Sequence, residues 1–301
     1  MKARALRKGE TIAVVGVSGP VRPERLRKGI DALLDADHPV EVGRGALQRH
    51  GFFAGPDEVR AADLDAAIHR EDLPAIFFSR GGWGAMRVLE RVDLEALRAR
   101  PRVLLGYSDL TTIFMALQRP GRPYPVRYGP NVVELGEPRA FDAPSLEKAL
   151  YLPEPRLLHT LTGCRIVRPG RGRGVLIGGC LSLIVSLLGT PWDLPFDGSI
   201  LFWEEFNEPP HRIDRMLTQL RLAKKLEGLA GMIVGRLARC GPGRGSPALP
   251  LREMLLDAAA GTRYPIVTDF PCGHIPRKRT LLLGVPAEIS TARRRLVLQA
   301  R

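Results

Sequence analysis

The residues with the clearest chemical potential lie in the segment 103–112, where an apolar run ends at Gly106 and Ser108 follows. A helix-like stretch, 110–117, comes next, so the chain must turn sharply and present the Ser108 hydroxyl near a helix N-terminus. Nucleophilic serines of acyl-transfer enzymes are presented in this way. The segment lacks the full G-x-S-x-G pattern, however, and a Ser-Asp pair before a helix is also an ordinary N-cap. On its own, the motif favours the interpretation as a helix N-cap over that as a nucleophile.

A serine nucleophile needs a base, and the base needs an orienting partner. His274 follows a strand-like stretch and a glycine, in a polar loop where an imidazole can face a cleft; the alternative is a surface histidine. Glu204 and Glu205 lie in the strand-like stretch 199–206, and adjacent strand residues point to opposite faces. One of these carboxylates must therefore be buried with a partner or exposed at a strand end. Both alternatives stay open for each residue.

A glycine-rich turn, 80–84, separates a predicted strand from a predicted helix. Such a turn can cradle a phosphate, but this one lacks both the Lys-Ser/Thr ending of the P-loop and the G-x-G-x-x-G spacing of a dinucleotide site. We expect instead that its backbone N–H groups face Ser108 and stabilise an oxyanion. Glycine there would let the main chain approach the serine closely.

The elements that must position these residues alternate between strand and helix in the first half of the chain. The predicted strands are 11–17, 40–42, 75–78 and 103–107, and the predicted helices are 23–34, 57–69, 85–97 and 110–118. This alternation predicts an α/β fold with a doubly wound, mostly parallel sheet. Ligands of such sheets bind at the carboxyl ends of the strands, so the turns at Ser18, Arg80–Gly82 and Ser108 should converge on one site.

The pattern lapses from about 151 to 173, where prolines and alternating Gly and Arg predict a connection. A second unit follows. Its predicted strands are 174–177, 199–206, 231–235, 266–270, 281–285 and 295–299. Its predicted helices are 181–188, 210–224 and 251–260, and a turn is predicted at 178–179. We therefore expect two domains, residues 1–155 and 156–301.

The composition is that of an ordinary globular protein, with 301 residues, 45% hydrophobic and 26% charged. No apolar run reaches the roughly 18 residues of a membrane span. The first eight residues lack the apolar core of a secretory signal. We therefore expect a cytoplasmic protein without a membrane partner.

The net charge of +13 raises the question of a nucleic acid partner. Yet 38 of the 45 basic residues are Arg, spread along the chain and often beside Glu or Asp. No recognition-helix, zinc-finger or aromatic-basic signature accompanies them, so we expect no nucleic acid partner. The four cysteines are far apart and the six histidines lack a metal-binding spacing. Reduced thiols and the absence of a metal site are expected.

Several segments, taken in order, resemble one family. They are 12–20, 80–84, 106–111, 178–183, 201–205, 208–217, 273–274 and 282–284. The stretch 208–217, EPPHRIDRML, is the most specific of them. The chain resembles the LD-carboxypeptidase (murein tetrapeptide carboxypeptidase) family of serine peptidases, which also contains the microcin-C immunity peptidases. The resemblance covers nearly the whole chain.

This resemblance implies a doubly wound N-terminal domain, which carries the nucleophile, and a smaller β-rich α/β C-terminal domain, usually in a homodimer. It implies an enzyme without a cofactor that releases the terminal D-Ala from murein tetrapeptides during cell-wall recycling. Matching residue by residue makes Ser108 the nucleophile, His274 the base and Glu204 the orienting carboxylate. Because these residues come from both domains, the site must lie in the cleft between them, with Ser108 and His274 facing one another.

The remaining site residues are expectations about contacts around the triad. We expect the N–H groups of Gly82 and Asp109 to form the oxyanion hole. Arg80, Gly81 and Trp83 are expected to bind the murein peptide.

Two other functions stay open. A microcin-immunity peptidase, which cleaves aminoacyl-nucleotide toxins, would need an aromatic platform for adenine, and Trp83 or Trp192 could supply one. A murein-peptide-binding protein without catalysis is the other. Gly16, Cys180 and Tyr128 depart from the family pattern in ways that affect the substrate pocket more than the triad. The sequence leaves open whether the third residue of the peptide is meso-diaminopimelate or lysine.

Overall fold

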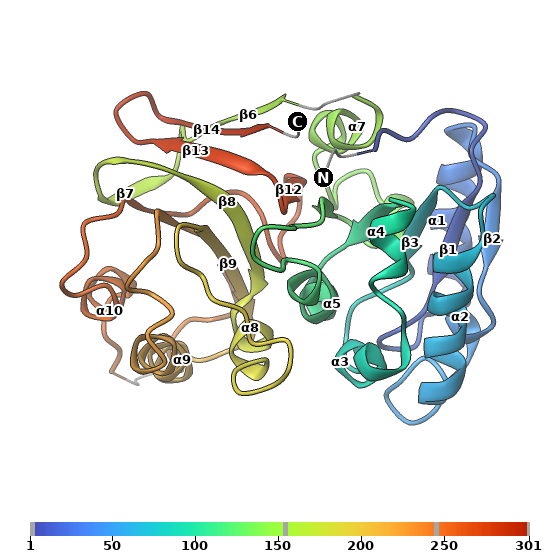
Figure 1. Ribbon diagram of the computed structural model, residues 1–301, viewed down its shortest axis with the longest axis horizontal. Helices are drawn as coiled ribbons and strands as arrows, with labels where there is room; N and C mark the ends of the chain where they lie inside the picture. The colour runs from blue at the N-terminus through green and yellow to red at the C-terminus, as the bar shows by residue number, and fades with distance from the viewer. Residues whose placement is uncertain (1–3, 153–155, 244–246, 300–301) are drawn as a thin grey trace.

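The computed structural model describes residues 4–152, 156–243 and 247–299, and it contains two β-sheets, drawn on the right and the left of Figure 1. The first sheet comprises β1 (Ile12–Val15), β2 (Val40–Val42), β3 (Ala75–Phe78), β4 (Val103–Gly106), β5 (Val126–Tyr128) and β12 (Leu281–Leu283). Its order is β12-β5-β4-β3-β1-β2. All neighbours are parallel except β12, which runs antiparallel to β5.

Helices cover both faces of this sheet. They are α1 (Pro23–Asp35), α2 (Asp57–His69), α3 (Ala85–Val88), α4 (Ala96–Ala99), α5 (Thr111–Ala116), α6 (Val132–Leu135) and α7 (Ala143–Tyr151), with short 3-10 segments at Arg44–Leu47, Leu89–Arg91 and Ser108–Leu110. In β1, Ile12 and Val14 pack with residues of α1, α6 and α7. Ala13 and Val15 pack on the other face with residues of α2, α3 and α5. The sheet is therefore doubly wound, and this predicted fold class is confirmed.

The second sheet comprises β6 (Arg156–Thr160), β7 (Arg165–Arg168), β8 (Arg171–Cys180), β9 (Ile200–Phe206), β10 (Gly231–Ala238), β11 (Ile266–Thr268), β13 (Pro286–Ser290) and β14 (Arg295–Gln299). Its order is β6-β14-β13-β8-β9-β10-β11-β7. The four strands β8 to β11 are parallel neighbours, and the outer pairs are antiparallel. The accompanying helices are α8 (Leu181–Ser186), α9 (Pro210–Leu222) and α10 (Leu251–Ala258). None of the described helices is long and apolar enough to span a bilayer.

One continuous core joins the two sheets. A single apolar cluster contains Phe114 of α5 together with Leu181 of α8 and Phe202 of β9. The strand β12 also belongs to the first sheet, although its sequence neighbours lie in the second. The two sheets are therefore held in place by packing, which fixes the relative positions of site residues that come from each.

The predicted helix 85–97 is wrong as a single helix. It consists of α3, a 3-10 turn and the separate short helix α4. Val92 is extended, with φ of −125° and ψ of 132°. The Asp93 carboxylate then accepts hydrogen bonds from the N–H groups of Glu95 and Ala96, both at 3.1 Å. An aspartate in that position starts a new helix, which ends the periodicity of the first.

The predicted connection 151–173 is also partly wrong, because β6, β7 and the beginning of β8 lie within it. The strands β6 and β7 form the two edges of the second sheet. Edge strands carry charged residues that discourage pairing with other chains, so they lack the clear apolar alternation of a central strand. The sequence pattern therefore missed them.

The predicted turn at 178–179 lies inside β8, where Gly178 and Gly179 have φ of +132° and +149°. A Cβ atom at Gly179 would lie 2.3 Å from the Thr111 hydroxyl oxygen of α5. The Cys180 N–H donates to the same hydroxyl at 2.9 Å. The glycines therefore let α5 approach β8 closely and bring the two sheets together.

The predicted strand 281–285 exists as β12, but it joins the first sheet, whereas the sequence pattern assigned it to the second unit.

Candidate active site

Ser108 lies directly after β4, in the 3-10 turn that leads into α5. Its φ is +68°, in the left-handed region that costs a non-glycine residue about 1–2 kcal/mol. Strained strand-to-helix turns of this kind expose a serine hydroxyl at the end of a sheet. The neighbouring glycine-rich turn touches the serine, since a Cβ at Gly81 would lie 2.8 Å from the Ser108 Cβ. Only glycine fits there without moving Ser108.

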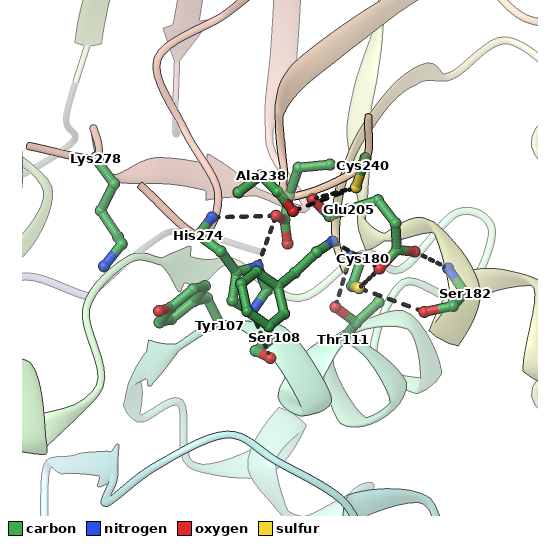
Figure 2. Close-up of polar contacts among 12 residues, drawn as sticks. Tyr107, Ser108, Thr111, Cys180, Ser182, Glu205, Ala238, Cys240, His274 and Lys278 are labelled. Carbon is green, nitrogen blue, oxygen red and sulfur yellow. Dashed lines mark hydrogen bonds and ion pairs between the residues drawn. The ribbon is translucent and has the colours of Figure 1, made fainter. Parts of the chain in front are cut away.

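Three predicted site residues form one hydrogen-bonded chain, and two of them, Ser108 and His274, are labelled in the middle of Figure 2. The Ser108 Oγ lies 2.9 Å from His274 Nε2, and His274 Nδ1 lies 2.8 Å from Glu204 Oε2. The backbone N–H of His274 donates to the same Oε2 at 3.2 Å, and Tyr128 donates its hydroxyl to Oε1 at 2.7 Å. A carboxylate on Nδ1 holds the neutral imidazole in the tautomer whose Nε2 can accept the serine proton.

The surroundings of His274 favour a proton on its ring. Burial lowers the pKa of the imidazole, but the Glu204 carboxylate raises it, with smaller contributions from Glu134 and Glu205, so the pKa lies above its usual 6.5. Two aromatic rings pack against the imidazole, with centroid separations of 4.9 Å for Tyr107 and 5.0 Å for Phe206. The imidazole is therefore both basic and fixed in orientation.

A cavity of about 660 Å³ opens beside this chain of hydrogen bonds. Its walls come from both sheets: the turn 80–83 and Tyr107 on the side of the first, and Cys180, residues 182–183 and residues 205–208 on the side of the second. The predicted substrate contacts Arg80, Gly81 and Trp83 all line it. The Gly19 N–H donates to the Gly81 carbonyl at 3.2 Å, so the turns at Ser18, Arg80–Gly82 and Ser108 do converge.

The two residues expected to supply oxyanion donors lie in the glycine-rich turn and directly after Ser108. Gly82 lies in the cavity wall, with φ of +125°. The Asp109 side chain is buried and accepts a hydrogen bond from the Ala85 N–H at 2.8 Å. Burial raises the pKa of that carboxyl to about 6. The Asp109 side chain therefore ties the serine turn to the start of α3, which follows the glycine-rich turn.

The adjacent carboxylates Glu204 and Glu205 have separate surroundings. Glu205 accepts hydrogen bonds from the Ser182 N–H at 2.7 Å and the Cys180 thiol at 3.1 Å, on the right of Figure 2. Burial raises the pKa of the Glu205 carboxyl. Of these two carboxylates, only Glu204 hydrogen-bonds His274 among the described residues.

The sequence did not single out Tyr107. The expectation that Tyr128 affects the substrate pocket more than the triad is wrong, because its hydroxyl donates to Glu204. Tyr107 follows β4 directly, and Tyr128 ends β5. Both therefore occupy the carboxyl ends of parallel strands, the position where ligands of such sheets bind. That placement was the available signal, and it was hidden for Tyr128 because the pattern did not predict β5.

Within residues 4–152, 156–243 and 247–299, no group of three or more His, Cys, Asp or Glu is placed to hold a metal ion. The four cysteines are buried free thiols. Burial raises the pKa of Cys180 and Cys272 well above the ordinary thiol value. Neither thiol is therefore activated as a nucleophile.

Comparison with known proteins identifies the family. The family model of the LD-carboxypeptidase N-terminal domain matches residues 12–123, and that of the LD-carboxypeptidase C-terminal domain matches residues 173–289. The chain belongs to the LD-carboxypeptidase family.

Individual relatives agree with this assignment. A putative carboxypeptidase of Streptomyces coelicolor is 38% identical over 295 residues, 93% of this chain and 90% of that protein. A probable murein peptide carboxypeptidase of Bacillus subtilis is 31% identical, over 99% of this chain and 94% of that one. These relatives support a peptidase activity.

Two solved structures share the fold. The microcin C7 self-immunity protein, in its wild-type apo state, has a TM-score of 0.89 at 22% identity and covers 100% of this chain and 99% of that one. A muramoyltetrapeptide carboxypeptidase from Oxalobacter formigenes has a TM-score of 0.84 at 27% identity, with 96% and 98% covered. Proteins that are named for different functions therefore share this fold.

Proposed function

We propose that this chain is a serine carboxypeptidase that hydrolyses the L,D-peptide bond before the terminal D-Ala of murein tetrapeptides, in cell-wall recycling. The observation that carries the proposal is the chain of hydrogen bonds from Ser108 through His274 to Glu204 at the wall of the cavity. The murein peptide carboxypeptidase name of the Bacillus subtilis relative supports the substrate class.

The proposed reaction uses the geometry of this chain directly. The Ser108 Oγ attacks the carbonyl carbon of the scissile bond while His274 Nε2 takes its proton. The N–H groups of Gly82 and Asp109 stabilise the oxyanion. The imidazolium, held by the Glu204 carboxylate, then gives the proton to the amine of the leaving D-Ala. A water molecule hydrolyses the acyl-enzyme by the same route and restores Ser108.

A carboxypeptidase must also recognise a free terminal carboxylate, and Arg80 is the residue that we assign to it. Arg80 lines the cavity beside Gly81, and its Nη1 donates to the Pro20 carbonyl at 2.6 Å, which holds the guanidinium in place. No ion pair of the described residues engages it, whereas the other cavity arginine, Arg25, pairs with Glu137 at 2.9 Å. An arginine without a carboxylate partner is available for that of the substrate.

Replacing Arg80 with Met should lower kcat/KM for a murein tetrapeptide about 10- to 100-fold, the worth of one hydrogen bond to a charged group. The same tetrapeptide with a C-terminal amide should be cleaved equally by the wild type and the variant. Arg25→Met is the matched control, with a smaller expected loss because Arg25 already has a carboxylate partner. Equal losses on both peptides would show that Arg80 does not bind the terminal carboxylate.

The direct test of the proposed function is release of D-Ala from purified tetrapeptides, with either meso-diaminopimelate or lysine at the third position. We expect release from at least one, and labelling of Ser108 by a fluorophosphonate probe. Labelling without release from any peptide would contradict the proposed substrate. No labelling and no release would favour a murein-peptide-binding protein.

The likeness in fold to the microcin C7 self-immunity protein gives a second candidate, a peptidase of aminoacyl-nucleotides. Trp83 is 63% exposed at the cavity wall and offers a stacking surface for a base. Assaying an aminoacyl sulfamoyl adenosine beside the tetrapeptides on one preparation separates the two substrates. We expect the tetrapeptide to be preferred.

The family resemblance also supports a homodimer and a cytoplasmic location. Sedimentation velocity tests the first, since a dimer has twice the 33.1 kDa mass of the chain. Fractionation of the producing cells tests the second.

A further inference from the structure

A buried ion pair lies beside His274 and is not used by the proposed triad. The Lys278 Nζ lies 2.5 Å from Glu134 Oε1, and the two side chains are only 3% and 14% exposed. The Tyr107 hydroxyl donates to the same Oε1 at 2.9 Å. The Lys278 ammonium also lies 4.6 Å from the centroid of the Tyr107 ring. The three side chains therefore form one compact group, called here the Glu134 cluster.

The Glu134 cluster is anchored to the first sheet. The second carboxylate oxygen of Glu134 accepts the Asn131 N–H at 3.0 Å, as part of the capping box of α6. The carbonyl of Lys278 accepts a hydrogen bond from the Asp142 N–H at 2.9 Å, at the start of α7. The loop that carries His274 is therefore fastened to the opposite domain only four residues beyond the histidine.

The cluster meets His274 through an aromatic ring. The Tyr107 ring centroid lies 4.9 Å from that of the imidazole, with the planes tilted by 51°. Figure 2 shows Tyr107 and Lys278 on one side of His274, while Cys180, Ser182 and Glu205 lie on the other. Movement of the Tyr107 ring would therefore open space beside the imidazole.

We propose that Glu134, Lys278 and Tyr107 are positioning residues, which hold the His274 ring toward Ser108 and balance the charge around it. This inference rests on the proposed function, because it assigns His274 the role of base. The charged and titratable groups beside His274 include the carboxylates of Glu204, Glu134 and Glu205, the Lys278 ammonium and the Tyr107 hydroxyl. The Tyr128 hydroxyl donates to Glu204, the buried Cys272 thiol is two residues away in sequence, and Arg80, Cys180 and Glu208 line the same cavity.

The ion pair acts on the imidazole through two opposed charges. A carboxylate nearby favours the protonated imidazole, and an ammonium disfavours it. Glu134 with Lys278 therefore anchors Tyr107 while adding little net charge beside the base. Removing either charge alone must shift the titration of His274, and the two removals must shift it in opposite directions. A pair that only stabilised the loop would give no such opposition.

The test is the pH dependence of kcat/KM for D-Ala release, whose acid limb reports the base of the free enzyme. In Lys278→Met, the midpoint of the acid limb should rise by about half a pH unit or more, because the Glu134 charge is no longer balanced. In Glu134→Gln, the midpoint should fall by a similar amount. The double variant should return toward the wild-type midpoint, with a lower kcat and little change in KM.

Lys225 offers a matched control. Its Nζ lies 2.6 Å from Asp193 Oδ1 and 5.6 Å from the Phe196 ring centroid, so it repeats the same kind of contact away from the cavity lining. Lys225→Met should leave the acid limb unchanged. Lys278→Arg, which keeps the charge, should restore the wild-type midpoint.

The inference is overturned if Lys278→Met and Glu134→Gln are folded and active but leave the midpoint unchanged, or shift it in the same direction. Circular dichroism checks folding. If Lys278→Met does not fold, Glu134→Gln and the double variant decide. The midpoint of the acid limb must then be lower in Glu134→Gln than in the wild type, and it must return toward the wild-type value in the double variant. If even the wild type releases no D-Ala, the proposed function fails, and NMR titration of His274 in the same variants tests the charge balance separately.

Discussion

The two sheets support the candidate site in different ways. On the side of the first sheet, backbone shape positions the serine: Ser108 has a positive φ, and Gly81 touches it without a side chain. On the side of the second sheet, charge and hydrogen bonds position the histidine: buried Glu204 bonds both the ring and the main chain of His274. The proposed nucleophile, Ser108, should therefore be sensitive to small changes in volume. The proposed base, His274, should be sensitive to changes in charge that leave volume unaltered.

The largest effect is expected from removing the nucleophile. Ser108→Ala should lower kcat for D-Ala release by several orders of magnitude, because the reaction loses its covalent step. The melting temperature should stay the same or rise. The partner that loses the Ser108 hydroxyl is His274 Nε2, and because His274 lines an aqueous cavity, water can take the place of the hydroxyl. A kinetic assay with calorimetry on the same samples checks both. Wild-type release by this variant would exclude Ser108 as the nucleophile.

The next effect tests charge on the side of the second sheet. Glu204→Gln should cost about 10²- to 10⁴-fold in kcat, because the amide no longer stabilises the imidazolium and can favour the wrong tautomer. Glu205→Gln is the control at the adjacent position and should keep most activity, since Glu205 bonds Ser182 and Cys180 instead of His274. Steady-state kinetics of the two variants separates the two carboxylates. A larger loss in Glu205→Gln would reverse the assignment.

The corresponding test of backbone shape adds one methyl group. In Gly81→Ala, the new Cβ would lie 2.8 Å from the Ser108 Cβ, so the serine or the turn must move. A displacement of a fraction of an ångström in a reacting atom should cost about 10²-fold in kcat/KM. Gly241→Ala, at a position where a Cβ meets nothing within 4 Å and φ is not positive, is the control for a general cost of replacing glycine. Unchanged activity in Gly81→Ala would mean that the serine turn tolerates adjustment.

The smallest effect is a shift in pH dependence. The raised pKa of His274 predicts an acid limb of kcat/KM with a midpoint above 6.5, because the protonated imidazole cannot accept the serine proton. In Glu204→Gln the midpoint should fall, since burial is then opposed only by the smaller contributions of Glu134 and Glu205. The pair of His274 and Glu204 stabilises the folded protein below pH 6.5. This contribution to the free energy of unfolding disappears as the pH rises through the pKa of His274 in the folded protein. A wild-type midpoint below 6.5 would contradict the electrostatic account.

The sequence predicted the residues whose chemistry stands out and missed those whose role comes from packing. Ser108 and the turn 80–84 end strands whose alternation with helices is visible in the sequence, so their convergence followed from the fold class. Glu134 and Lys278 could not be paired, because they are 144 positions apart and meet only where the chain crosses between sheets. Their types alone are those of ordinary surface residues.

The strands show the same limit. Central strands such as β3 and β4 are buried on both faces and read as apolar runs. The strand β5 has only three residues and includes an arginine, so its pattern is too short to detect. That arginine, Arg127, is fully buried and donates to the Ala149 carbonyl at 3.1 Å. Burial of a cation by backbone carbonyls leaves no signature in hydrophobic periodicity.

The position of β12 has a consequence for how the molecule is made. This strand completes the edge of a sheet whose other strands end at Tyr128, and it follows His274 by only seven positions. Because the chain is synthesised from its N-terminus, the serine turn can form before the more than one hundred residues that separate it from His274 have been made. The histidine and the last strand of the first sheet are made together, more than a hundred residues after the serine turn. Assembly of the site thus depends on contacts of long sequence separation, which form slowly in folding. The nascent protein therefore carries Ser108 without its proposed base until His274 and the last strand of the first sheet are made.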